Sequence, residues 1–232
     1  RIEDIVVLGL HAAPLAIQLE RLDLGAVARQ LTPAGQPAPV KGSGERVQRV
    51  PSLDLRVEDL RWGKLPLGTL DIALRKQPSG LDLSHLTLSG RGTLTAYGVG
   101  GWSRSRDGGR TGVDITLSSP DLGYLFRALD DQSNLAAADA RATLKLAWPG
   151  DFRAFSLRRA DGTIALKVGK GQLLEVEPGL GRVLGFFEFG TLSRRLALDF
   201  SDLFGEGFAF ETVDGLIRIG DGKANFDRFH ID

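Results

Sequence analysis

The three histidines are the side chains best suited to proton transfer or metal binding, but their positions support neither role. His11, His85 and His230 are far apart in the sequence, and none has a second ligand at the spacing of a metal motif. The chain contains no Cys, which excludes disulfides, zinc–thiolate sites and a cysteine nucleophile. We therefore expect solvated or packed histidines, no metal site and no histidine base.

A pair of carboxylates is the second candidate for chemistry. Asp199 and Asp202 lie close in sequence to Arg194 and Arg195. Two carboxylates can serve as general acid and general base, but these are three residues apart around a predicted strand end, so nothing fixes them on one face. An ion-paired cluster that stabilises the turn is the better interpretation.

The glycine-rich segments do not match nucleotide-binding motifs. The run from Gly179 to Gly185 lacks the GxGxxG spacing and does not lie between a strand and a helix of a βαβ unit. Gly169-Lys170-Gly171 is not a P-loop, and no GxSxG elbow is present. The sequence therefore predicts no cofactor, and we expect the chain not to be an enzyme.

The balance of charge excludes another class of function. Lys plus Arg (29) equal Asp plus Glu (29), so no net field gathers nucleic acid or an acidic membrane surface. No apolar run reaches the ~18 residues of a membrane-spanning helix. The chain starts at Arg1 and ends on an alternating segment, as an excised piece would, so we expect any membrane anchor to lie outside it.

Leucines between residues 53 and 88 follow one repeated pattern. In three successive segments they alternate with polar residues, skip two positions and resume in the opposite phase. The skips fall at Glu58-Asp59, Gly68-Thr69 and Ser84-His85. Alternation with a period of two is typical of β-strands with one apolar face.

The skips predict β-bulges. An unbroken strand with this pattern would bury its two halves on opposite faces, whereas one extra residue at each skip restores a single apolar face. With a hairpin tip at Gly63-Lys64, Glu58-Asp59 lies opposite Gly68-Thr69. A second turn at residues 78–80 would bring Ser84-His85 within about two residues of that register, so that the bulges form a crease.

The fold class that follows is mainly β: an elongated, strongly curved antiparallel sheet, groove-like or taco-like, with two short amphipathic helices. Its apolar face would carry aliphatic side chains, and its other face polar ones. The residues expected to line the apolar face are Leu53, Leu55, Val57, Leu65, Leu67, Leu70, Ile72, Leu74, Leu81, Leu83, Leu86, Leu88, Val113, Ile115, Leu117, Leu144, Leu146, Ile164 and Leu166. The polar residues expected on the other face are Asp54, Arg56, Asp71, Arg75 and Asp82.

A second interpretation stays open, in which each skip is an ordinary turn between short strands of a β-sandwich. Both interpretations are all-β. Further strands are expected at residues 5–8, 15–19, 94–104, 113–117, 142–148, 164–168, 196–200, 208–210 and 216–219, joined as a meander.

The chain is expected to divide into four parts. N-terminal strands of the groove occupy residues 1–31, with a short helix after Asp23, and a Pro- and Gly-rich flexible loop occupies 32–49. The antiparallel groove extends over 50–170, with a helix near 121–130 that Ser119 or Asp121 could cap. A C-terminal region over 171–232 contains a helix near 178–189 and closing strands.

Several motifs of the C-terminal region point to a known family. They are Leu173-Leu174-Glu175-Val176-Glu177-Pro178-Gly179, Gly181-Arg182-Val183-Leu184-Gly185, Arg194-Arg195-Leu196, Asp199-Phe200-Ser201-Asp202-Leu203-Phe204 and Gly207-Phe208-Ala209-Phe210. This region resembles the conserved end of the YhdP proteins, which are large AsmA-like proteins of Gram-negative bacteria. Residues 53–60 and 121–123 resemble segments that precede this end, so that the resemblance covers residues 51–232. The positions it marks as structural are Gly181, Gly185, Arg195, Asp199, Phe200, Asp202 and Phe208.

The resemblance implies a function in the cell envelope. YhdP-like proteins are anchored in the inner membrane, cross the periplasm as a β-groove and are implicated in passive phospholipid transport towards the outer membrane. By this resemblance the partners would be phospholipid acyl chains, the two membranes at the ends of the full-length protein, and other envelope proteins. The alternative is an envelope scaffold that binds strands of partner proteins at its sheet edges.

Overall fold

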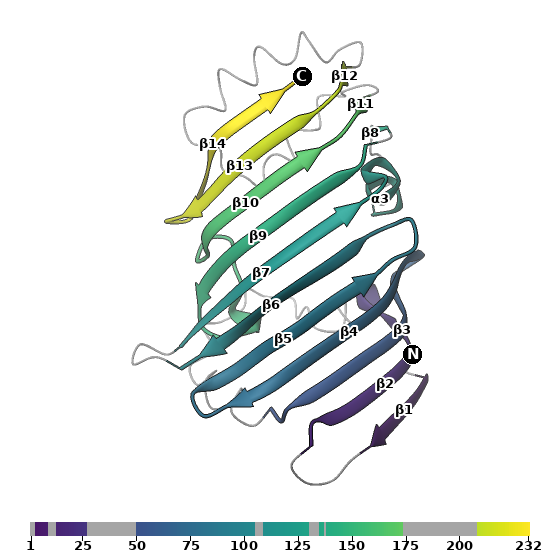
Figure 1. Ribbon diagram of the computed structural model, residues 1–232, viewed down its shortest axis with the longest axis vertical. Coiled ribbons are helices and arrows are strands. Elements are labelled where there is room, and N and C mark those ends of the chain that lie inside the picture. The colour runs from purple at the N-terminus through teal and green to yellow at the C-terminus, as the bar shows by residue number, and fades with distance from the viewer. Residues whose placement is uncertain are drawn as a thin grey trace. The chain divides into compact units, whose positions relative to one another are not determined.

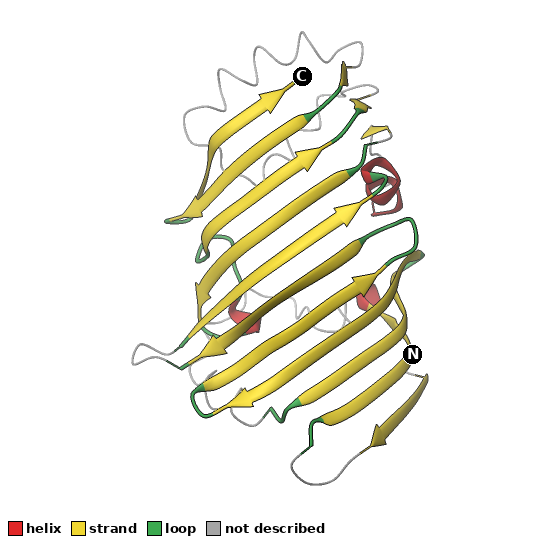
Figure 2. Cartoon of the chain, in the orientation of Figure 1, coloured by secondary structure: helices red, strands yellow, loops and turns green. Residues whose placement is uncertain are grey.

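The computed structural model describes residues 3–8, 13–26, 50–104, 109–129, 135–136, 138–173 and 208–232. Strands dominate these ranges (Figure 2), which confirms the mainly β class. The chain forms two compact units, residues 1–117 with 147–155 and residues 118–146 with 156–232. Each unit is considered by itself.

The first unit is built on seven strands that lie side by side in chain order (Figure 1). The strands are β1 (Glu3–Leu8), β2 (Leu15–Asp23), β3 (Leu53–Trp62), β4 (Leu65–Gln77), β5 (Gly80–Ser89), β6 (Thr95–Ser103) and β7 (Arg110–Ser119), the last of which belongs to this unit up to Leu117. The 3-10 helix η1 (Phe152–Ala154) completes the unit.

One strand pair departs from the expected meander. β2 and β3 are parallel, with Leu15 beside Leu53 and Leu19 beside Val57. Parallel neighbours need a crossover connection of a dozen residues or more, and residues 24–52 provide that length. A helix starts in this connection at Leu24, as expected after Asp23, whose Oδ1 accepts hydrogen bonds from the backbone N–H groups of Gly25 (2.9 Å) and Ala26 (3.3 Å).

The phase skips in the sequence are bulges. The β3–β4 register shifts between Val57 and Leu60, so that Glu58 and Asp59 lie opposite Thr69, and the turn is at Gly63-Lys64. β5 bulges at Ser84, and its pairing with β6 shifts between Leu83 and Leu86. The bulges of β3 and β5 are confirmed, and each keeps the leucines of its strand on one face. In β4 the extra residue is Leu67, next to the predicted skip at Gly68-Thr69, where the register shifts between Leu60 and Arg61.

The bulges do not form one crease. The two-residue turn at Pro78-Ser79 pairs Gln77 with Gly80, and from there Thr69 reaches Ser89. Ser84 lies four residues after Gly80, whereas Thr69 lies eight residues before Gln77, so the β5 bulge is opposite Ala73 instead. The expectation of a common register for all three skips was wrong, and the two bulge sites are staggered along the strands.

The second unit contains two sheets. Strands β9 (Ala140–Pro149, in this unit up to Leu146), β10 (Asp161–Val168), β13 (Val213–Gly220) and β14 (Lys223–Ile231) follow one another in that order. A smaller sheet has the order β12 (Phe208–Phe210), β11 (Gly171–Leu173), β8 (Leu135–Ala136). The predicted hairpin turn joins β13 to β14 at Asp221-Gly222, where both residues have positive φ, of 52° and 72°.

The expected helix near 121–130 is α3 (Leu122–Leu129). Asp121 caps it, because its Oδ1 accepts a hydrogen bond from the backbone N–H of Tyr124 at 2.8 Å. Leu125 is buried, but Phe126 is 42% exposed and does not belong to the packed face. The helix predicted near 178–189 and the strand predicted at 196–200 lie outside the described residues.

Candidate functional site

The aliphatic side chains of the first unit form three rows that cross the strands. The middle row joins Ile17, Leu55, Ile72 and Leu86 through direct cross-strand pairs. The flanking rows are Leu15, Leu53, Leu74 and Leu83 on one side and Leu19, Val57, Leu70 and Leu88 on the other. The predicted leucine face is therefore a continuous surface over β2 to β5, and we call it the aliphatic face.

The exposure of these side chains differs along the strands. In the middle row all four residues are partly exposed. Towards one strand end the burial becomes complete, with Val57 at 0%, Leu60 at 2% and Leu65 at 2%. The floor of the aliphatic face is thus accessible at its centre and closed at that end.

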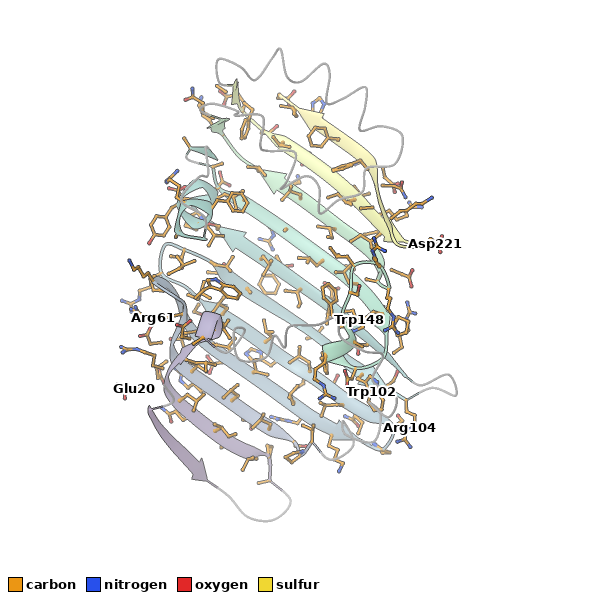
Figure 3. The ribbon with its side chains drawn as sticks, turned by 180° about the vertical axis from the view of Figure 1, so that it is seen from behind. Glu20, Arg61, Trp102, Arg104, Trp148 and Asp221 are labelled. Carbon is orange, nitrogen blue, oxygen red and sulfur yellow. The ribbon has the colours of Figure 1, made fainter. Side chains whose placement is uncertain are left out.

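The opposite end of the aliphatic face is closed by an aromatic cluster (Figure 3). Trp102 (2% exposed) packs with Leu81, and Phe152 of η1 packs against both. The segment around η1 is held by Trp148, whose Nε1–H donates to the carbonyl of Asp151 at 2.9 Å, and by Thr111, whose hydroxyl donates to the carbonyl of Gly150 at 2.7 Å. We call this end of the strands the Trp102 end.

Strand β6 continues the rows with small residues. Gly100 pairs with Leu83, Gly98 with Leu86 and Ala96 with Leu88. A Cβ at Gly98 would lie 2.6 Å from the carbonyl oxygen of Asp114, so no larger residue fits without a shift. Ile115 and Val113 of β7, which were expected on the aliphatic face, lie beside Gly98 and Gly100.

Two parts of this surface were missing from the predicted lining residues, although a strand of the groove was expected at residues 15–19. The glycines of β6 could not be found from the alternation of apolar side chains, because glycine has none. Leu15, Ile17 and Leu19 of β2 do have one, since the skip at Glu20-Arg21 before Leu22 repeats the skip of β3, and the two skips lie in register. The same rule that gave the lining residues of β3 would have added Leu15, Ile17 and Leu19 of β2.

Predicted lining residues of the second unit are partly covered. Leu166 packs against a cluster formed by Ala138, Val168 and Phe210, and Leu122 of α3 packs against the same cluster. Ile164 pairs with Ile217, Leu144 is partly exposed and Leu146 is 6% exposed. The family-motif positions Gly181, Gly185, Arg195, Asp199, Phe200 and Asp202 lie outside the described residues, and of Phe208 only its place in β12 is described.

The other face of the first unit carries the charged residues expected there, and four of them form ion pairs. Arg56 binds Asp71 directly across β3 and β4 at 2.9 Å, and Arg75 binds Asp54 at 2.6 Å. A hollow of about 350 Å³ opens here above Ala16 and Ala73. The charged residues that line it already form ion pairs with one another or with Arg75, so we assign it no ligand.

The carboxylates of the β3 bulge are held in their ionised form. The hydrogen bond from Arg21 (2.8 Å) is the main cause that lowers the pKa of Asp59, and Arg61 contributes further. The hydrogen bond from Arg56 lowers the pKa of Glu58 in the same way. Because both pKa values are lower in the folded state, these groups stabilise the fold above the ordinary carboxyl range near pH 4, and this contribution is lost as the pH falls through the folded pKa.

Replacing Asp59 with Asn should therefore reveal a pH-dependent loss of stability. At pH 7 we expect the thermal midpoint to fall by about 1–3 °C, as for an exposed ion pair. Below the folded pKa of Asp59 the variant and the parent should melt together, because Asp59 is then protonated in both states. Asp82 forms no ion pair among the described residues, so Asp82→Asn is the control. An equal loss at pH 7 and below the folded pKa of Asp59 would contradict the role assigned to this residue.

No catalytic arrangement is present among the described residues. His85 lies 3.0 Å from the hydroxyl of Thr87, and His230 lies 2.9 Å from Asp232. Within the same ranges no three His, Asp or Glu residues are placed to hold a metal. His11 and the cluster at 194–202 lie outside them. None of the helices described there has the length and hydropathy to span a membrane.

The fold and surface define a class: a mostly antiparallel β-protein whose aliphatic face is accessible at its centre. The chain belongs to the YhdP family, because the family model described as "YhdP protein" matches residues 5–232. This confirms the resemblance seen in the motifs.

One curated relative is similar to part of the chain. It is the "Intermembrane phospholipid transporter YhdP" of Escherichia coli (strain K12), with 36% identity over 73 residues. The match covers 31% of this chain and 6% of the relative. The chain therefore spans a small fraction of that protein's length. No solved structure matches the chain.

Proposed function

We propose that this chain binds phospholipid acyl chains on its aliphatic face and forms one segment of a longer, non-catalytic lipid conduit between the two membranes of the cell envelope. The observation that carries the proposal is the partly exposed middle row of Ile17, Leu55, Ile72 and Leu86. Family membership and the phospholipid transporter in Escherichia coli support the choice of lipid.

The physical argument starts from the cost of exposing this row to water. Each CH₂ group transferred from water to an apolar surface contributes roughly 0.8 kcal/mol. An acyl chain laid on the middle row removes both its own apolar surface and that of the row from water. The predicted lining residues of β3, β4, β5 and β7 act here as a floor.

We call the partly exposed part of the aliphatic face the lane. Its direction follows from the positions of the two closed ends. Val57 and Leu65 are buried towards one strand end, and Trp102 is buried at the other. The partly exposed residues lie between them and extend from β2 to β7. At roughly 4.8 Å per strand, six strands give a lane of about 24 Å that crosses the strands. Lipid would move from strand to strand, and the periplasm is the compartment that such a segment would bridge.

The proposal is tested by mass spectrometry of lipids extracted from the purified chain after detergent-free lysis and washing. Reproducible recovery of phospholipid in a fixed ratio to protein is the expected result. An unrelated β-protein purified in parallel is the control for carry-over. Recovery no greater than in this control would reject lipid binding by the chain.

A second candidate is a scaffold that binds a partner strand at a sheet edge. It is favoured by β14, a nine-residue strand that pairs with β13 alone among the described strands. Hydrogen exchange separates the candidates. Lipid should protect residues of the first unit, whereas an added partner strand should protect the amides of β14.

A further inference from the structure

The Trp102 end of the first unit has an excess of positive charge. Five cations of the described residues lie at these strand ends and on η1, against three carboxylates. The cations are Arg75, Lys76, Arg104, Arg110 and Arg153, and the carboxylates are Asp54, Asp82 and Asp151. The opposite strand ends are balanced, with Arg21, Arg61, Lys64 and Arg91 against Glu20, Asp23, Glu58 and Asp59. Figure 3 places Arg104 beside Trp102, and Glu20 and Arg61 at the opposite ends.

Lys76 and Arg104 differ from the other cations of this set, because Arg75, Arg110 and Arg153 each interact with another group. Arg75 binds Asp54 at 2.6 Å and Arg153 binds Asp151 at 2.8 Å. Lys76 and Arg104 are exposed, and neither forms an ion pair within the described ranges. Their charges are therefore available to an anion.

Lys76 lies on the aliphatic face. It follows Leu74 by two residues on β4 and pairs directly with Leu81, which pairs with Trp102. Side chains two residues apart on a strand share a face. Leu70, Ile72, Leu74 and Lys76 thus form one line along β4. The backbone of Lys76 lies about 20 Å from that of Leu70, because each step of two residues covers roughly 6.8 Å.

Arg104 lies two residues beyond Trp102 along the chain. It follows β6 directly, and its backbone N–H donates to the carbonyl of Ser79 at 2.7 Å, which fixes the main chain at this point. β4 and β6 are two strand spacings apart, or about 10 Å. An anion between Lys76 and Arg104 would sit over the closed rim at Leu81 and Trp102.

On the basis of the proposed function, we infer that the Trp102 end binds the phosphate of a phospholipid headgroup, with Lys76 and Arg104 as its contacts, and that the segment prefers anionic phospholipids. The aliphatic floor accepts the acyl chains of the same molecule. A zwitterionic headgroup carries an amine that the excess positive charge opposes, whereas phosphatidylglycerol does not.

The experiment measures binding of fluorescent phosphatidylglycerol and phosphatidylethanolamine to the purified chain at low ionic strength. We expect the parent to prefer phosphatidylglycerol. Lys76→Gln and Arg104→Gln should each weaken its binding about fivefold, and the double variant should bind both lipids equally. Lys64→Gln, which removes an exposed lysine from the opposite strand ends, is the matched control and should leave the preference unchanged.

The outcomes separate this inference from the proposed function. If both lipids bind but the double variant keeps the preference for phosphatidylglycerol, the headgroup site is wrong and the aliphatic face stands. Inorganic phosphate is titrated in parallel. If the double variant loses binding of inorganic phosphate without any change for phosphatidylglycerol, the Trp102 end is a simple anion site and the inference is overturned. If neither lipid binds the parent, the proposed function fails and this inference with it.

Discussion

Replacing Leu86 with Asp should abolish phospholipid binding while the chain stays folded. Leu86 lies in the partly exposed middle row between Ile72 and Gly98, so an introduced carboxylate reaches water in the free protein. An acyl chain on the same row would have to desolvate that charge, which costs several kcal/mol. We expect at least a tenfold loss of bound lipid in extraction experiments, with a thermal midpoint lowered by only a few degrees.

Two further substitutions define what this result means. Ser89→Asp adds the same charge to the same strand on the polar face and should leave lipid binding intact. Val57→Asp places the charge at a site with 0% exposure and should unfold the first unit. If Leu86→Asp unfolds the chain as Val57→Asp does, the middle row is core and no lane exists.

Replacing Trp102 with Ala should produce the largest loss of stability of any single change at the closed end. Trp102 is 2% exposed and packs with Leu81 and Phe152. Its indole N–H has no acceptor among the described residues, so packing alone holds the ring. Removal of such a ring typically costs about 3–5 kcal/mol, measurable as a shift of the urea midpoint.

The matched control is Trp62→Ala, which deletes the same side chain from a position that is 45% exposed and should cost much less. Gly109 gives an independent check, because a Cβ there would lie 2.6 Å from Nε1 of Trp102. Gly109→Ala should therefore destabilise the same unit. Equal effects of Trp62→Ala and Trp102→Ala would contradict the closed end described here.

Local spacing was enough to predict the strands and most bulges. A period of two requires apolar residues on one face, so the phase change between Val57 and Leu60 could only be an extra residue or a turn, and the register shows an extra residue. The Asp221-Gly222 turn follows from the freedom of these residues to adopt positive φ. Asp121 and the leucines after it likewise specify α3.

Tertiary structure decided which leucines are covered. Leu55 and Leu81 belong to the same alternating pattern, yet Leu55 remains partly exposed and Leu81 is 4% exposed. The difference comes from the cluster that Leu81 forms with Trp102, against which Phe152 packs although it lies 71 residues beyond Leu81. Sequence periodicity cannot predict such a contact. Alternation indicates on which face of the sheet a side chain lies, but not which residues cover it.

The parallel pairing of β2 with β3 and the stagger of the bulges have the same origin. Both depend on the number of residues between elements. The parallel pairing requires the long connection after Asp23, and the stagger arises because Thr69 and Ser84 lie at unequal distances from the turn between β4 and β5. The sequence by itself determined a β-protein with one aliphatic face and no catalytic motif. Only the tertiary structure decided where that face is open, because exposure depends on contacts between residues that are distant along the chain.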